Sequence, residues 1–218
     1  MLKIENTEVM GWEHAIRGMR NPKNSWEKSD STFHLMIDDD KAEDFIGKND
    51  LNLMTALRNA GTDHRKFMRM IVVYLDITAP LYWWKEFDTY KVGTVANSCS
   101  TMHKIAAKEF TLDDFSHEHL QDDSVAVLES VIHTLNVHRE WFNNKVLDDP
   151  KIDWWQLIQL LPSSYNQKRT LLVNYEVLAN IYHQRKGHRL DEWTTFCEWI
   201  KGLPMSEIIT GEEPKTAK

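Results

Sequence analysis

The chain contains 218 residues, of which 42% are hydrophobic and 11% are aromatic, including nine Trp. This composition is sufficient for a packed core and excludes a globally disordered chain. The formal net charge of −7, with no basic stripe to offset it, excludes a protein that coats a nucleic acid polymer. A small anionic ligand held by a few local cations is compatible with this charge.

The cysteine content and the N-terminal sequence indicate the cellular compartment. Cys99 and Cys197 are too few for a disulfide framework or a usual zinc site, which suits a reducing cytoplasm. The N-terminus lacks the apolar run of a signal peptide, and no stretch approaches the roughly 20 apolar residues that span a bilayer. We therefore expect a cytoplasmic protein with no membrane partner.

The first 60 residues predict a short strand and two helices. Residues 2–5 are expected to form the strand, and a helix is expected from Thr7, where Trp12 and Ile16 recur at helical spacing. The polar stretch NPKNSWEKSDS is typical of a loop. A second helix is expected over residues 41–60.

The middle of the chain changes period. Over residues 67–78, Ile71, Val73 and Leu75 alternate with other side chains, and β-branched residues dominate, which predicts a strand partly covered on both faces. Pro80 interrupts this strand, and the stretch LYWWKEFDTY is expected to follow as helix or irregular chain.

The C-terminal half has mainly helical spacing. A long helix is expected over residues 124–147, and a turn with a short helix before Pro162. Two further helices are expected over about 168–185 and 190–201.

These elements predict an α+β fold that is mostly helical, with a small mixed or antiparallel sheet flanked by long helices. We find no linker and no internal repeat. A single domain is therefore expected over residues 1–208, followed by a flexible C-terminal tail over residues 209–218.

A polar segment, DTYKVGTVANSCSTMH at residues 88–103, differs from ordinary core sequence. It concentrates Gly, Thr, Ser and Asn, which chains use where the backbone approaches a ligand closely. Cys99 lies inside it and is either a nucleophile or a structural thiol, and His103 is four residues away. The segment is a candidate ligand-binding turn.

Other patterns have competing interpretations. His117 and His119 could supply two metal ligands, but no third or fourth ligand is visible, and a solvated loop is the favoured interpretation. The Trp pairs at 83–84 and 154–155 indicate core or subunit contacts, with a stacking platform as the alternative.

Three cations lie on the helix expected over 168–185. Lys168, Arg169 and Arg185 belong either to a solvated face or, for the first two, to an anion site near the helix N-terminus.

The order of these pieces resembles the flavin-dependent thymidylate synthases. Their hallmark, R-H-R-x-x-S-x-N-E-x-S-x-R-Y, follows an Ala-Pro pair, which this chain has at 79–80. Asn97 and Ser100 occupy matching positions in NSCSTMH, Thr94 stands for the first Ser, and Lys91 falls at the last Arg of the triplet.

The C-terminal half matches the family pattern without a gap. In order along the chain, the family has a Leu-Pro pair, a cationic residue, an Asn, and a helix that carries an Asn and a final Arg. This pattern resembles the stretch LPSSYNQKRTLLVNYEVLANIYHQR. The matched positions are Pro162, Lys168, Asn174, Leu178, Asn180 and Arg185. The resemblance covers roughly residues 5–204.

The resemblance implies a homotetramer that binds a pyrimidine nucleotide such as dUMP and uses FAD, with NADPH and methylene-tetrahydrofolate when active. Ser100 and Lys168 would hold the substrate phosphate, and Arg185 would polarise a pyrimidine carbonyl, which makes Arg185 and Ser100 the expected catalytic residues. Glu86, where the family has Gln, would accept a hydrogen bond from the substrate. The implied cofactor-binding residues are Lys91, Thr94, Asn97, Asn174 and Asn180.

Several hallmark positions are changed. The Arg-His-Arg triplet is replaced by residues 89–91, Thr-Tyr-Lys, and an expected Arg is Glu176. Each lost charge-assisted hydrogen bond to a flavin diphosphate would cost about 1.5–3 kcal/mol. Two functions follow: a divergent enzyme that transfers a methyl or one-carbon group to carbon 5 of a dUMP-like nucleotide with FAD, or a catalytically lapsed nucleotide-binding or regulatory module without flavin chemistry.

Overall fold

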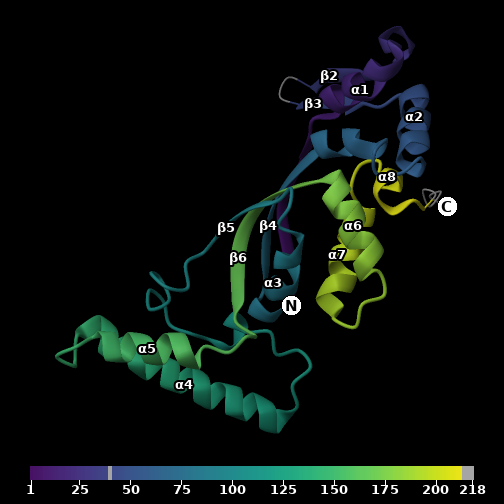
Figure 1. Cartoon of the computed structure of the whole chain (residues 1–218). Coiled ribbons are helices and arrows are strands. Elements are labelled where there is room, and N and C mark those ends of the chain that lie inside the picture. Colours follow the sequence, from purple (N-terminus) through teal and green to yellow (C-terminus); the bar gives the residue numbers. More distant parts are fainter. Residues whose placement is uncertain (39–40, 213–218) are drawn as a thin grey trace. The chain divides into compact units, whose positions relative to one another are not determined.

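The computed structural model describes residues 1–38 and 41–212 of the chain (Figure 1). Its strands and helices are, in chain order, β1 (Lys3–Met10), α1 (Trp12–Arg20), β2 (Thr32–Asp38), β3 (Lys41–Phe45), α2 (Lys48–Asn59), β4 (Val72–Pro80), α3 (Leu81–Phe87), β5 (Val95–Ser98), α4 (Asp122–Asn144), α5 (Lys151–Leu160), β6 (Asn166–Asn174), α6 (Tyr175–Arg185), α7 (Asp191–Lys201) and α8 (Glu207–Thr210). Within these described ranges, no helix is both long and apolar enough to cross a membrane.

The strands form one small sheet and one hairpin. The four-stranded sheet has the order β1-β4-β6-β5, and β2 pairs with β3 as an antiparallel hairpin. Helices make up most of the remaining regular structure, which confirms the predicted α+β class.

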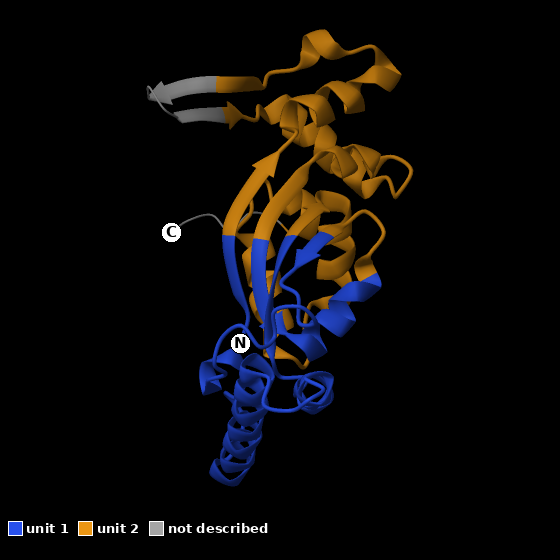
Figure 2. Ribbon diagram, turned by 90° about the vertical axis from the view of Figure 1, so that its left-hand side faces the viewer, with its two compact units in different colours: residues 1–5, 76–89, 96–170 blue, residues 6–75, 90–95, 171–218 orange. Residues whose placement is uncertain are grey.

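The chain divides into two compact units, coloured separately in Figure 2. Unit 1 contains residues 1–5, 76–89 and 96–170, and unit 2 contains residues 6–75, 90–95 and 171–218. The single domain over residues 1–208 therefore stays a prediction. Helix α8 extends into the segment predicted as a tail, with Ile209 buried, and residues 213–218 lie outside the described residues.

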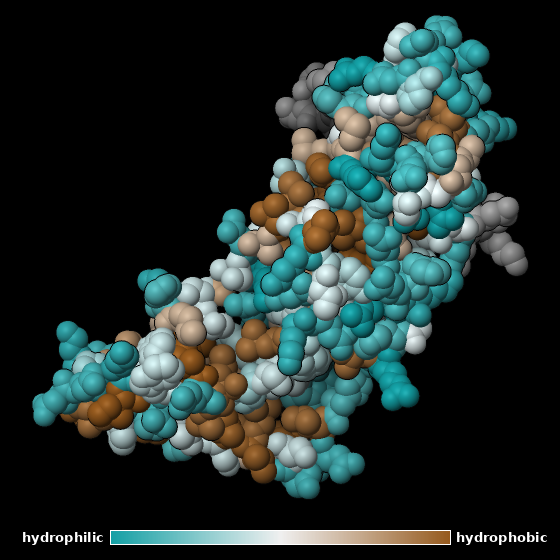
Figure 3. All heavy atoms as spheres, in the orientation of Figure 1, coloured by the Kyte–Doolittle hydropathy of each residue, from teal (hydrophilic) through white to brown (hydrophobic). Residues whose placement is uncertain are grey.

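Unit 1 has its own apolar cluster beneath the hairpin of α4 and α5. Phe110, Phe115, Leu135 and Leu157 are buried there. Asn136 ties the incoming chain to α4, because its side chain accepts a hydrogen bond from the Phe110 N–H at 2.8 Å and donates one to the Phe110 carbonyl at 2.9 Å. Figure 3 shows further apolar side chains on the surface over this hairpin.

The two Trp pairs have different environments within unit 1. Trp83 and Trp84 of α3 are buried, as expected for core residues. Trp155 is 43% exposed, and Trp154 donates a hydrogen bond from its indole to the Met102 carbonyl at 3.0 Å. The second pair is therefore a surface feature, and the homotetramer stays a prediction.

Two expected helices begin later than predicted. A glycine turn precedes the first helix, and a cap from a residue distant in sequence fixes the start of the second. The segment from Thr7 continues β1, and Gly11, at φ 97°, lies so close to the Met70 carbonyl that a Cβ would be 2.1 Å from its oxygen. The helix expected from residue 41 begins at Lys48, and its first turn is capped from outside the helix. The Asp30 carboxylate accepts the N–H of Asn49 at 2.9 Å and that of Asp50 at 3.1 Å.

The predictions around residues 67–78 and 168–185 each merged two elements. Residues Arg65–Met70 form the 3-10 helix η3, and β4 begins only at Val72. Residues Asn166–Asn174 are strand β6, and helix α6 starts at Tyr175. Pairing with β4 and β5 overrides the helical spacing of β6, so Lys168 lies on a strand and not near a helix N-terminus. Helices α4 and α7 confirm the predicted helices near 124–147 and 190–201.

A buried carboxylate organises the loop after α1 in unit 2. Asp50 of α2 accepts a hydrogen bond from Arg20 Nε at 2.7 Å, and its second oxygen accepts the hydroxyls of Ser29 and Ser31, each at 2.7 Å. The same oxygen accepts the N–H groups of Asp30 and Ser31 at 3.2 Å. Burial raises the pKa of Asp50, but these hydrogen bonds outweigh burial and hold the pKa below its ordinary value.

Substitution of Asp50 by Asn should therefore lower the free energy of unfolding by about 3–5 kcal/mol, because the buried Arg20 would lose its charged partner. The folded-state pKa is depressed, so the contribution of Asp50 is present at neutral pH and is lost as the pH falls through that pKa. Urea titrations at neutral and acidic pH measure both effects. The exposed Glu13→Gln control should change stability by less than about 1 kcal/mol, and an equal effect of the two substitutions would contradict the assignment.

Candidate functional site

Arg185, the last residue of α6, lies among aromatic side chains in unit 2. Its Nε donates a hydrogen bond to the Tyr90 hydroxyl at 2.9 Å. Its guanidinium carbon is 4.7 Å from the ring centre of Trp193 and 5.6 Å from that of Tyr90. His188 Nε2 lies 3.2 Å from Arg185 Nη1. Cation–π contacts of this kind contribute roughly 0.5–2 kcal/mol and hold the guanidinium in one orientation.

Tyr90 connects the polar segment to α6 inside unit 2. Besides accepting from Arg185, its hydroxyl donates to Gln184 Oε1 at 3.0 Å. Tyr90 occupies the position of His in the family triplet, and no role was predicted for it from the sequence. Tyr90 and Arg185 are 95 positions apart in the sequence, so no local signal indicated that they meet.

Two predicted cofactor residues, Thr94 in the turn after Tyr90 and Asn174 at the start of α6, use their side chains for hydrogen bonds within the protein. The Thr94 hydroxyl lies 3.1 Å from the Tyr90 carbonyl and 3.2 Å from the Lys91 carbonyl. Asn174 caps α6 by accepting the Val177 N–H at 3.0 Å, and its amide donates to the Gly93 carbonyl at 3.4 Å. Thr94 and Asn174 therefore shape the turn, while the Lys91 side chain is exposed.

The start of α6 carries a carboxylate where the family resemblance implies a cation. Glu176 is ion-paired with Arg69, and its other oxygen lies 3.5 Å from Arg65 Nε. Arg65 also donates from Nη2 to Asn180 Oδ1 at 3.2 Å. The third predicted cofactor side chain, Asn180, is thus also bound within the protein.

Lys168 of β6 lies among acidic side chains in unit 1. Its Nζ is 3.0 Å from Asp76 Oδ2 and 3.9 Å from Glu5 Oε2. The hydrogen bond to Asp76 raises the pKa of Lys168 above its ordinary value. A phosphate at Lys168 would have to compete with these carboxylates. The neighbouring Arg169 pairs with Asp88 at 2.9 Å.

The remaining predicted residues also belong to unit 1. The Cys99 N–H donates to the Lys168 carbonyl at 2.9 Å, which places the segment around Ser100 beside β6. Ser100 is exposed and its oxygen accepts the His103 N–H at 3.0 Å, while Asn97 is exposed on β5. Glu86 is half-buried on α3.

Comparison with known proteins rests on structure. No family model matches the chain, and no curated protein matches its sequence. Thymidylate synthase X from Helicobacter pylori, solved with FAD and dUMP, superposes with a TM-score of 0.67 at 13% identity over 100% of both chains. A second structure of flavin-dependent thymidylate synthase from Helicobacter pylori, complexed with FAD and dUMP, gives a TM-score of 0.65 at 14% identity over 94% of this chain and 96% of that one.

The chain has the fold of the flavin-dependent thymidylate synthases. A UMP/dUMP methylase from Streptomyces cacaoi, bound with 5-Br dUMP, shares the fold with a TM-score of 0.58 at 12% identity, over 100% of this chain and 97% of that one. At these identities the comparison establishes the fold, and activity has to be argued from the site.

The donors present in this chain do not fit a flavin diphosphate as the family hallmark implies. Thr94, Asn174 and Asn180 are engaged inside the protein, and Lys91 is the one cation among the five predicted cofactor residues. The carboxylate of Glu176 adds repulsion toward a diphosphate. We therefore derive no chemical step through a flavin.

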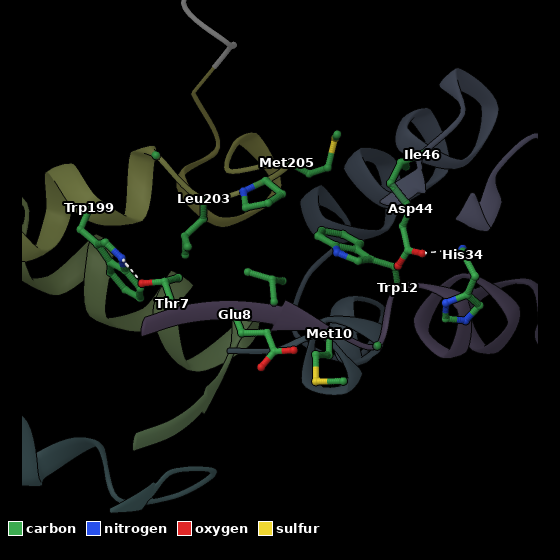
Figure 4. A pocket seen from close by; sticks show the side chains of 14 residues that line it. Thr7, Glu8, Met10, Trp12, His34, Asp44, Ile46, Trp199, Leu203 and Met205 are labelled. Atoms are coloured by element: carbon green, nitrogen blue, oxygen red, sulfur yellow. Dashed lines mark hydrogen bonds between the residues drawn. The ribbon is translucent and has the colours of Figure 1, made fainter. Parts of the chain in front are cut away.

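The largest described cavity of unit 2, of about 820 Å³, contains none of the predicted site residues (Figure 4). Trp12, Leu203 and Met205 give it an apolar lining, and its acidic lining residues are Glu8 and Asp44. An anionic nucleotide is poorly matched to this lining, because two carboxylates would repel its phosphate.

Replacing Glu176 tests whether it balances the two arginines. Glu176→Gln should lower the free energy of unfolding by about 1–3 kcal/mol, because Arg65 and Arg69 lose a buried carboxylate. Glu176→Arg should lower the free energy of unfolding further, because it places a third cation beside Arg65 and Arg69. Urea denaturation provides the measurement, with the exposed Glu198→Gln as the control. A Glu176→Arg variant as stable as the parent would refute this role.

The two thiols should differ in reactivity. Burial raises the pKa of Cys197 to about 11, whereas Cys99 is exposed. A chromogenic disulfide reagent at neutral pH should therefore modify Cys99 quickly and Cys197 only after unfolding, because the thiolate is the reactive form. Cys99→Ser should abolish the fast phase, and two fast thiols in the native protein would contradict the burial of Cys197.

Proposed function

We propose that the chain binds a pyrimidine deoxynucleotide of the dUMP type, with Arg185 as the residue that contacts the base. The observation that carries this proposal is the fixed orientation of the Arg185 guanidinium by Tyr90 and Trp193. Support comes from the shared fold, since solved proteins with that fold contain dUMP or 5-Br dUMP.

The chemistry of a held guanidinium suits a pyrimidine. Its planar set of N–H donors matches a carbonyl oxygen, and its charge stabilises negative charge that forms on the ring. Because Tyr90 and Trp193 restrict its motion, less entropy is lost when a ligand binds Arg185.

Ser100, Lys168 and Glu86, which all belong to unit 1, stay predictions from the family resemblance, the first two as phosphate contacts and Glu86 as an acceptor for a ring N–H of the base. Ser100 accepts a backbone N–H through its oxygen, so its own proton is available to donate to a phosphate. Lys168 would exchange Asp76 for the phosphate, which makes its net contribution small. A homotetramer is part of the proposal, by resemblance to the family.

Flavin-dependent methyl transfer is the second candidate function. It is favoured by two structures of the same fold that contain FAD together with dUMP. The changed triplet and the carboxylate of Glu176 favour the binding module instead.

Substitution of Arg185 tests nucleotide binding. We expect dUMP to raise the thermal midpoint of the parent protein, and Arg185→Ala to weaken dUMP binding by roughly 10- to 100-fold through loss of a charged hydrogen bond. Tyr90→Phe should weaken binding less, because it loosens the guanidinium without removing it. Calorimetric titration with dUMP measures both.

The matched control is Arg189→Ala, which removes an exposed cation shortly after α6. It should leave dUMP affinity within about twofold of the parent. Equal affinity of the Arg185→Ala variant and the parent would refute the proposal.

The visible absorbance of the purified protein separates the two candidates. A protein that is colourless, ignores added FAD and is stabilised by dUMP supports the binding module. A flavin spectrum that co-elutes with the protein would favour the enzyme.

A further inference from the structure

A second cavity of unit 2, of about 360 Å³, gathers cations without an acid in its lining. It is bordered by α2, η3, α6 and α8, which contact one another and lie close together in Figure 1. The lining side chains that carry a polar group are Arg58, Asn59, Arg65, Asn180, Tyr182, His183 and Thr210. Its volume is in the range of small-ligand pockets, which begins near roughly 300 Å³.

Arg58 has no carboxylate partner among the described residues. Its Nη1 donates to the neutral Asn59 amide at 3.0 Å, and its buried Nε has no hydrogen-bond partner in the described part of the chain. Burial, and then the charge of Arg65, lower the pKa of Arg58 below its ordinary value. A buried, unsatisfied charged donor is costly, and such groups mark strained, catalytic or ion-binding positions.

The C-terminal segment is shaped to admit the Arg58 guanidinium. A Cβ on Gly211 would lie 2.3 Å from Arg58 Nη2, and Gly211 adopts φ 72°. The position of the guanidinium is therefore accommodated by a glycine.

Arg65 provides the second cation and is itself held in place. Glu176 lies 3.5 Å from its Nε, and Asn180 accepts from its Nη2 at 3.2 Å. Glu176 is shared with Arg69 and does not line the cavity. The lining therefore carries two guanidinium groups and no carboxylate, and an anion would relieve their repulsion.

We propose that this cavity binds the phosphate group of a small ligand. Guanidinium groups match phosphate oxygens in pairs, and Asn59, His183 and Thr210 offer neutral hydrogen-bonding groups around them. The site is separate from Arg185, so the proposal does not depend on the proposed pyrimidine contact.

Calorimetric titration of the full chain with inorganic phosphate tests the site. The parent should bind phosphate saturably below about 10 mM, and Arg58→Gln or Arg65→Gln should weaken binding about tenfold or more. Lys66→Gln is the matched control, because it removes an exposed cation from the same short helix outside the cavity, and it should change affinity by less than about twofold.

Competition identifies the source of the phosphate. If dUMP displaces inorganic phosphate and deoxyuridine does not, the group belongs to a nucleotide; if neither displaces it, a different phosphorylated ligand or free phosphate occupies the cavity. Both results support the site. Arg185→Ala should retain phosphate binding, which separates failure of the proposed function from failure of this proposal.

Three results would overturn the proposal. These are absence of saturable phosphate binding by the parent, unchanged affinity in Arg58→Gln and Arg65→Gln, or an equal loss in Lys66→Gln. If Arg58→Gln does not fold, because Arg58 packs against Gly211, then Arg65→Gln alone decides, with circular dichroism confirming that it is folded.

Discussion

The ion pairs of Glu176 with Arg65 and Arg69 determine how positive charge is distributed around helix α6. A carboxylate buried to 7% exposure needs cationic partners, and η3 supplies both of them. Because Arg69 binds the same carboxylate, Glu176 only partly neutralises Arg65. Arg65 can therefore hold Asn180 and still contribute charge to the cavity beside Arg58.

The junction of β6 and α6 also fixes the position of the residue at the C-terminal end of the helix. β6 lies inside the four-stranded sheet, Asn174 caps α6, and the Tyr175 N–H donates to the Ile71 carbonyl at 3.0 Å. A helix fixed at its first turn presents its last residue in a defined place, and there Tyr90 and Trp193 receive Arg185. One rigid element thus connects Glu176, Asn180 and Arg185.

Local sequence predicted the fold class and the long helices because α4 and α7 carry apolar spacing that needs no distant partner. It failed where distant groups decide the structure. Asp30 caps α2 across the intervening hairpin, and sheet pairing makes a strand of the residues around Lys168. The site shows the same limit: motif order located Arg185 and Asn180, but no spacing rule links Arg185 to Tyr90, or Asn180 to Arg65.

Charge partners distinguish the cations that are suited to a ligand from those that are not. In unit 1, Lys168 and Arg169 already face Asp76 and Asp88, so an incoming phosphate would only replace one anion by another. In unit 2, Arg185 is held against aromatic rings, and Arg58 donates to a neutral amide, which does not cancel the charge of Arg58. The shared fold is compatible with several activities and does not decide between them. The different partners of these cations favour anion recognition in unit 2 over a flavin site of the family type.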